Sequence, residues 1–169
     1  MLMGPRLRKL ALTSHIGCSV GLLGAVAAFL SLAIAGLAST SAAIVDAVYQ
    51  VLPALAWSVV LPLSVASLLS GLIQSLGTVW GLFRHYWVVA KLLLTCLVIA
   101  ILLLQLQLID GLAGAARRDA IAGDALFEAR ASLVAHAGGG LLVLLLPVIL
   151  SVYKPRGLTP YGESRSRQR

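Results

Sequence analysis

The chain has 169 residues, of which 60% are hydrophobic and only 11% are charged, and its formal net charge is +7. Soluble domains carry charge on about a quarter of their residues, so this composition excludes an ordinary soluble domain. The basic excess is expected to report membrane topology or contact with anionic lipid, and not nucleic acid, because no nucleic-acid-binding motif accompanies it.

Long uncharged stretches indicate the membrane spans. A bilayer core about 30 Å thick is crossed by about 20 apolar residues in a helix. Four stretches have this length, and the predicted helices are 14–38, 53–76, 85–109 and 130–153. We therefore predict an all-α fold, a polytopic membrane protein with a four-transmembrane-helix bundle. Basic segments flank it at 1–13 and 154–169.

The first predicted helix carries small residues at helical spacing. Gly17, Gly21 and Ala25 share one face, and Gly139 gives the fourth helix a similar position. Small residues four apart let two helix backbones approach closely in a membrane. We expect this face to pack within the bundle, and a homodimer interface is the alternative. The apolar stretch is longer than the core of a signal peptide, so we expect it to be retained.

The second predicted helix carries a polar stripe. Its members recur at helical spacing: Ser64, Ser67, Gly71, Gln74 and Thr78. Pro62 removes a backbone hydrogen bond just before the stripe, and nearby hydroxyl groups can satisfy the freed carbonyl. Hydrogen bonding between helices is the expected role of such serines. Lining a hydrated path through the membrane is the alternative.

The segment "WGLFRHYWVVAK" (80–91) is predicted to form the cytoplasmic turn between the second and third helices. Its aromatic rings suit the depth of the lipid headgroups, and its cations are expected to extend towards lipid phosphate. A more specific hypothesis is a site for anionic headgroups. The candidate residues are Trp80, Arg84, His85, Tyr86, Trp87 and Lys91.

Two polar residues, Gln105 and His136, lie inside the outer ends of the third and fourth helices. At 1.5 Å per residue both are roughly 6–9 Å below the surface, so their depths match. An unpaired polar group there is costly, and a mutual hydrogen bond is the simplest remedy. We predict this interhelical contact. The alternative is that His136 faces an outer cavity as a proton or ligand site.

The distribution of Lys and Arg predicts the orientation. The two termini and the 80–91 turn hold ten of these residues, whereas the opposite side holds only Arg117, Arg118 and Arg130. Positive residues remain on the cytoplasmic side. We therefore predict a protein of the bacterial inner membrane with both termini in the cytoplasm.

Three segments of the sequence resemble a known family. They are "SVGLLGAVAAFLSLAIAGL" (19–37), "SGLIQSLGTVWGLFRHYWVVAKLLLT" (70–95) and "HAGGGLLVLLLPVILSVYKPRG" (136–157). They resemble a group of small bacterial integral membrane proteins of unknown function. The resemblance implies a four-helix membrane protein and supplies no catalytic residues. Where that group tends to carry a histidine near the outer end of the third helix, this chain has Gln105.

No motif in the sequence indicates an enzyme, a cofactor or a metal site. There is no P-loop, GxSxG or HExxH motif, and Cys18 and Cys96 lie inside apolar stretches. We predict a structural or accessory membrane subunit whose partners are the lipid bilayer, anionic headgroups and a second membrane protein or copy. The alternatives are a small transporter or channel subunit using His136, and a haem-binding or redox protein. For haem, His15 and His136 are expected near opposite membrane faces.

Overall fold

A computed structural model describes residues 3–78, 81–118, 126–155 and 157–167. Its elements in chain order are α1 (Pro5–Ala38), α2 (Ala42–Leu55), the π-helical turn η1 (Ala56–Val60), α3 (Leu61–Leu76), α4 (Tyr86–Ala116), α5 (Phe127–Tyr153) and α6 (Pro160–Arg167). The segment α2–η1–α3 is continuous, so four helices are long and apolar enough to cross a membrane. The predicted all-α, four-helix membrane fold is confirmed.

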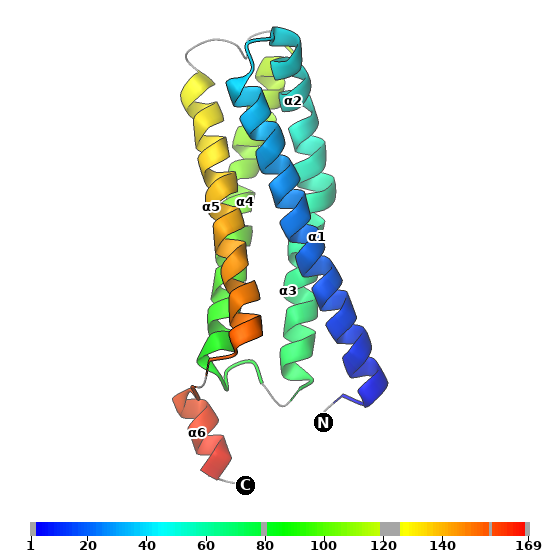
Figure 1. The fold of residues 1–169 in the computed structure, drawn as a ribbon, viewed down its shortest axis with the longest axis vertical. Coiled ribbons are helices and arrows are strands. Elements are labelled where there is room, and N and C mark those ends of the chain that lie inside the picture. The colour runs from blue at the N-terminus through cyan, green and yellow to red at the C-terminus, as the bar shows by residue number, and fades with distance from the viewer. Residues whose placement is uncertain (1–2, 79–80, 119–125, 156, 168–169) are drawn as a thin grey trace.

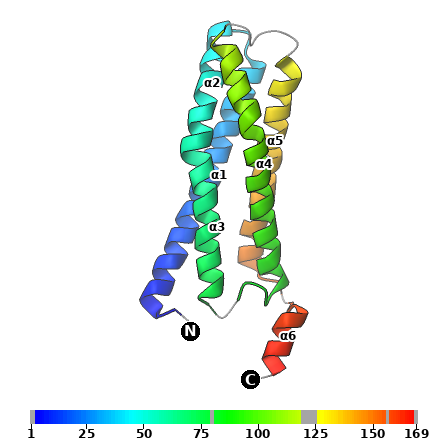
Figure 2. The ribbon, with the colours of Figure 1, turned by 180° about the vertical axis from the view of Figure 1, so that it is seen from behind.

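The four long helices stand side by side in one bundle (Figures 1 and 2). α1 packs on α2, α3 and α5, and α4 packs on α2, α3 and α5. Both chain termini and the turn between α3 and α4 lie at one end, which we call the terminal end. The last turns of α1 and α4 and the first turns of α2 and α5 lie at the other, which we call the far end.

All four membrane helices are longer than the sequence pattern predicts: α4 ends at Ala116 rather than at residue 109, α5 begins at Phe127 rather than at residue 130, and the starts of the first two helices differ most. α1 begins at Pro5 rather than at residue 14, because proline fits the first turn of a helix and the basic residues after it do not interrupt one. With 34 residues, α1 is about 51 Å long, so its first turns extend beyond a hydrocarbon core of about 30 Å. The second membrane helix begins at Ala42 rather than at Pro53, which lies inside α2.

The turn η1 lies between two prolines, Pro53 in α2 and Pro62 in α3. The N–H of Leu61 donates to the carbonyl of Ala56, five residues earlier, instead of four. Pro62 has no N–H, and its ring clashes with a carbonyl in the preceding turn, so a regular α-helix is disfavoured here. The wider turn places Ala56 and Val60 on the inner side of the bundle, where both are buried.

Apolar side chains are distributed as a bilayer requires. Two clusters of buried residues form the core, one around Tyr49, Ile109 and Leu133 and a smaller one around Leu22 and Leu144. Many large apolar side chains instead face outward, among them Leu104, which is 77% exposed. In water such a surface would drive association, whereas hydrocarbon solvates it.

The C-terminal segment folds back on the turn between α3 and α4. Thr159 donates from its N–H to the carbonyl of Arg84 at 3.0 Å and from its hydroxyl to the carbonyl of Phe83. Thr159 also caps α6, since its Oγ1 accepts the N–H of Gly162 at 3.1 Å. A side chain at Gly162 would collide with the Arg84 carbonyl. The last helix is therefore held at the terminal end by the backbone (Figure 1).

Candidate functional site

A cavity of about 520 Å³ lies at the terminal end, between α1, α3 and α4 and closed on one side by the end of α5. Its polar lining consists of basic, hydroxyl and amide side chains: Arg8, His15, Ser67, Gln74, Ser75, Thr78, Lys91, Thr95, Ser151 and Lys154. Among the described residues that line it, none is acidic. We call it the basic cavity.

Lys91 is the charged group set deepest among the helices that line this cavity. Its Nζ donates to Ser151 Oγ at 2.7 Å and lies 5.7 Å from the ring centroid of Trp87. The Ser151 hydroxyl donates its own proton to the carbonyl of Pro147. This hydrogen bond orients a lone pair of Ser151 Oγ towards the Lys91 ammonium. An ammonium has three N–H donors, and one hydrogen bond is made within the described part of the chain. Two donors therefore remain for a ligand.

Hydroxyl groups tie α1 to α3 along the same cavity. His15 Nδ1 is 3.1 Å from Ser70 Oγ, and Ser19 Oγ is 2.9 Å from Ser67 Oγ. Of the predicted polar stripe, Ser67 therefore makes the expected contact between helices, whereas Ser64 donates to the carbonyl of Leu61 in its own helical segment. Thr78 Oγ1, by contrast, is buried with no hydrogen-bond partner among the residues described. A buried hydroxyl without a partner is costly, and Thr78 can therefore donate to a group that binds in this cavity.

The predicted headgroup anchor is only partly where the sequence placed it. Tyr86 is 59% exposed, as an interfacial ring should be. Trp87, however, is buried at 9% exposure and Lys91 turns inward, because positions 87 and 91 lie one turn apart on the face that lines the cavity. The expectation that Lys91 extends towards lipid phosphate is corrected, and the headgroup depth expected of Trp87 stays a prediction.

Other members of the predicted anchor have different surroundings. Arg84 is half-buried beneath the C-terminal segment, and His85 forms an isolated bridge with Leu158. The His85 and Trp87 ring centroids are 6.3 Å apart. Trp80 lies outside the described residues. The described members of the set are thus split between the basic cavity and the α6 contact, and among them Tyr86 alone is an exposed ring.

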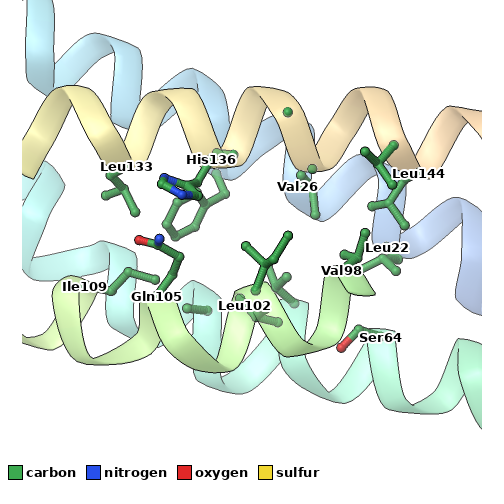
Figure 3. A pocket seen from close by; sticks show the side chains of 18 of the residues that line it. Leu22, Val26, Ser64, Val98, Leu102, Gln105, Ile109, Leu133, His136 and Leu144 are labelled. Atoms are coloured by element: carbon green, nitrogen blue, oxygen red, sulfur yellow. The ribbon is translucent and has the colours of Figure 1, made fainter. Parts of the chain in front are cut away.

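A second cavity, of about 360 Å³, occupies the middle of the bundle. Its walls are the apolar side chains of all four long helices, and the polar lining residues are Ser64, Gln105 and His136. Figure 3 shows this pocket, with α4 forming one wall and α5 the other. Gly139 and Gly140 lie in the α5 wall, and an added Cβ would meet nothing within 4 Å at either. We call this the apolar cavity.

Gln105 and His136 extend towards each other at one end of the apolar cavity (Figure 3). The predicted matching of their depths agrees with this placement. The predicted bond is not made through Gln105 Oε1, which is buried without a partner in the described structure. His136 Nδ1 instead lies 2.7 Å from the carbonyl and 3.2 Å from the hydroxyl of Ser132. Both side chains therefore border the apolar cavity, and an outer proton or ligand site at His136 stays a hypothesis.

The small residues divide into two groups. Gly21 and Ala25 pack inside the bundle, since an added Cβ on Gly21 would lie 3.5 Å from Leu63 and Ala25 is buried. Gly17 and Gly139 have open space around them. The tight contact is at Gly36, where an added Cβ would lie 2.9 Å from Tyr49 and Val48. Within the described chain, the predicted packing role thus holds for Gly21 and Ala25 alone.

Arg130 forms a polar cluster at the far end that the sequence pattern did not reveal. It is 7% exposed, and its guanidinium donates to the carbonyls of Gly36 and Leu37 and, at 3.3 Å, to Tyr49 Oη. It also lies 5.3 Å from the Tyr49 ring centroid. The two carbonyls belong to the last turn of α1, where backbone acceptors have no helical partner. The one available signal was an arginine in the first turn of an apolar helix.

No protein-family model, curated protein or solved structure matches the chain. The resemblance to small bacterial membrane proteins therefore stays a prediction, and the site must be interpreted from its own chemistry. In that chemistry His15 belongs to the basic cavity and His136 to the apolar one.

Proposed function

We propose that the protein is an accessory integral membrane protein, with no catalytic chemistry of its own, that binds an anionic group in the basic cavity. The observation that carries the proposal is the lining of this cavity. It contains basic side chains and hydroxyl groups, with no acidic side chain among the described lining residues; the basic ones are Arg8, His15, Lys91 and Lys154. Lys91 is the partly buried cation among them, whereas Arg8 and Lys154 are exposed, and a partly buried cation is stable only when it is paired. An anion with several acceptor oxygens would complete the set through charge-assisted hydrogen bonds.

The proposed orientation places this cavity at the cytoplasmic surface. Both termini lie at the terminal end of the bundle (Figure 1), where the residues that line the basic cavity also lie, and this end holds most of the Lys and Arg residues. The positive-inside rule therefore supports cytoplasmic termini and, for a bacterial protein, the inner membrane. Anionic lipids are abundant in a cytoplasmic leaflet and attract such a cluster of cations.

Reporter fusions test the orientation. A fluorescent protein fused after Arg169 is expected to be bright, and a phosphatase that works only outside the cytoplasm is expected to be active when inserted at Thr40. Thr40 lies in the short link between α1 and α2. High phosphatase activity from an insertion at Gly81, in the turn between α3 and α4, would contradict the orientation.

Competition between lipids tests the binding. The protein is inserted in nanodiscs with equal amounts of phosphatidylglycerol and phosphatidylcholine carrying the same chains, and native mass spectrometry measures the lipids that remain bound. We expect at least tenfold enrichment of phosphatidylglycerol, because only its headgroup is a net anion. Lys91→Met should abolish most of this enrichment. Lys9→Met is the matched control, since Lys9 is exposed and does not line the cavity.

A transporter or channel subunit is the second candidate. It is favoured by the buried serines of α3, since Ser67 lines the basic cavity and Ser64 the apolar one, so polar groups continue towards the middle of the bundle. Anion flux into proteoliposomes that depends on Lys91 would support it. The haem alternative is tested by an absorbance spectrum of the purified protein, and the two histidines in separate cavities do not favour it.

A further inference from the structure

The two cavities lie one above the other along the bundle. On α3, Ser67 lines the basic cavity and Ser64 the apolar cavity; on α4 the same holds for Thr95 and Val98. Each pair is three residues apart, which is about 4.5 Å along a helix. The inner end of the basic cavity therefore borders the apolar cavity along two walls, α3 and α4.

The polarity of the two cavities follows the polarity of one membrane leaflet. The basic cavity lies where the helices end, at the depth of lipid headgroups, and the apolar cavity lies further inside, at the depth of lipid chains. An elongated molecule spanning both would have its charged end at the surface and its hydrocarbon end inward. This is the orientation that a lipid already has in the same leaflet.

The contents of the apolar cavity are limited by its walls. A cavity can hold ordered water only if each molecule finds two to four polar partners, and this one offers Ser64, Gln105 and His136 in about 360 Å³. Of these, Ser64 already donates to the carbonyl of Leu61 at 2.7 Å. An empty space of this size would sacrifice packing on every wall. Hydrocarbon is the occupant that satisfies both conditions.

We propose that the ligand is an anionic amphiphile whose phosphate- or carboxylate-bearing head occupies the basic cavity and whose hydrocarbon chain occupies the apolar cavity. This inference rests on the proposed function, because it assumes that the basic cavity binds the head. The volume of the apolar cavity is near the lower limit for ligand sites, so it accommodates one chain. The chemistry is shared by a membrane phospholipid and by a free single-chain amphiphile.

The experiment varies the chain while the head stays constant. Lysophosphatidylglycerol with a palmitoyl or a hexanoyl chain is titrated into phosphatidylcholine nanodiscs, and native mass spectrometry measures the bound fraction. Gly140→Leu places a side chain in the apolar cavity, where Gly140 has open space. We expect it to lower retention of the palmitoyl compound at least fivefold and to leave the hexanoyl compound unchanged. Both proteins experience the same partitioning of the ligand into lipid, so the difference reports the cavity.

Controls separate this effect from misfolding. Gly24→Leu makes the same change at a glycine that is exposed and lines neither cavity, and it should leave retention of both compounds unchanged. Val98→Phe fills the cavity from the α4 wall and should reproduce the Gly140→Leu result. A helical circular dichroism spectrum like that of the wild type is required of each variant.

The two proposals fail in different ways. If phosphatidylglycerol is enriched through Lys91 but filling the apolar cavity changes nothing, the chain lies elsewhere and only this inference is overturned. If Lys91→Met changes no retention at all, the basic cavity does not bind the head and both are overturned. Comparison of dipalmitoyl phosphatidylglycerol with its single-chain counterpart then identifies the source: preferential retention of either one supports the proposal and names the ligand class.

Discussion

Each end of the bundle has a cationic side chain that faces inward, but the two cations differ in how many hydrogen-bond acceptors surround them. At the far end, Arg130 meets two backbone carbonyls, a phenol and an aromatic face. At the terminal end, Lys91 meets one hydroxyl group and one aromatic face, and it borders a cavity of about 520 Å³. The acceptors of Arg130 are part of the fold, whereas Lys91 has N–H donors that form no hydrogen bond within the described chain. A buried charge indicates structure when its hydrogen bonds are complete and indicates binding when they are not.

The largest effect is expected from Arg130→Met. The change leaves the carbonyls of Gly36 and Leu37 without a donor in a buried site, and it should lower the free energy of unfolding by about 2–3 kcal/mol. Equilibrium unfolding in mixed micelles, followed by circular dichroism, measures it. Arg118→Met removes an exposed arginine at the same end and should change stability by less than about 0.5 kcal/mol. Equal effects of the two changes would show that the Arg130 contacts contribute nothing.

Gly36→Ala tests the close packing that brings the α1 carbonyls to Arg130. The new methyl group would lie 2.9 Å from Tyr49 and Val48, so the helices must separate, at a cost of about 1–3 kcal/mol. The same unfolding assay reports it. Gly24→Ala is the control, because its Cβ meets nothing within 4 Å and alanine favours a helix. A stabilising effect at both positions would contradict the tight contact.

Lys91→Met is expected to be tolerated. The protein loses one hydrogen bond to Ser151 but no longer holds a partly buried charge, so the two effects oppose each other and stability should change by less than about 1 kcal/mol. Selective retention of anionic lipid should be lost in the same variant. A loss of stability as large as that of Arg130→Met would mean that Lys91 is also structural, and the contrast between the two ends would disappear.

The smallest effect on global stability is expected from Gly162→Ala. Its methyl group collides with the Arg84 carbonyl, so α6 should detach while the four-helix bundle stays folded. Faster trypsin cleavage within the C-terminal segment, with less than about 0.5 kcal/mol change in bundle unfolding, is the expected result. In Gly157→Ala the added Cβ would make an ordinary 3.6 Å contact with Tyr86, and cleavage should remain slow.

Local features of the sequence predicted the membrane helices well and the direction in which side chains face poorly. Uncharged length identified four membrane helices, and helical spacing identified Ser67, which contacts Ser19 of α1, but not Ser70, which contacts His15. Hydropathy carries no information about which way a side chain faces, so Lys91 was expected to extend towards lipid phosphate although it faces the cavity, and the burial of Trp87 was not predicted. The two carbonyls that accept from Arg130, those of Gly36 and Leu37, are 94 and 93 residues away in sequence, so no local pattern could predict these contacts. Pro53 resembled a helix start because proline is favoured there, which hid the eleven residues of α2 before it, 42–52.

The π-helical turn sets the rotational phase between the two halves of the second membrane helix. The buried positions Leu52, Ala56, Val60 and Ser64 follow one another in steps of four. In a regular α-helix each such step turns about 40° too far, so three steps would rotate the inner face by about 120°. The wide turn of η1 absorbs this drift. One residue removed from η1 would therefore swing the serine face of α3 by about 100° and point it into lipid, with every residue of α3 unchanged. A single position in η1 thus sets how the α3 half of this helix is rotated relative to the α2 half.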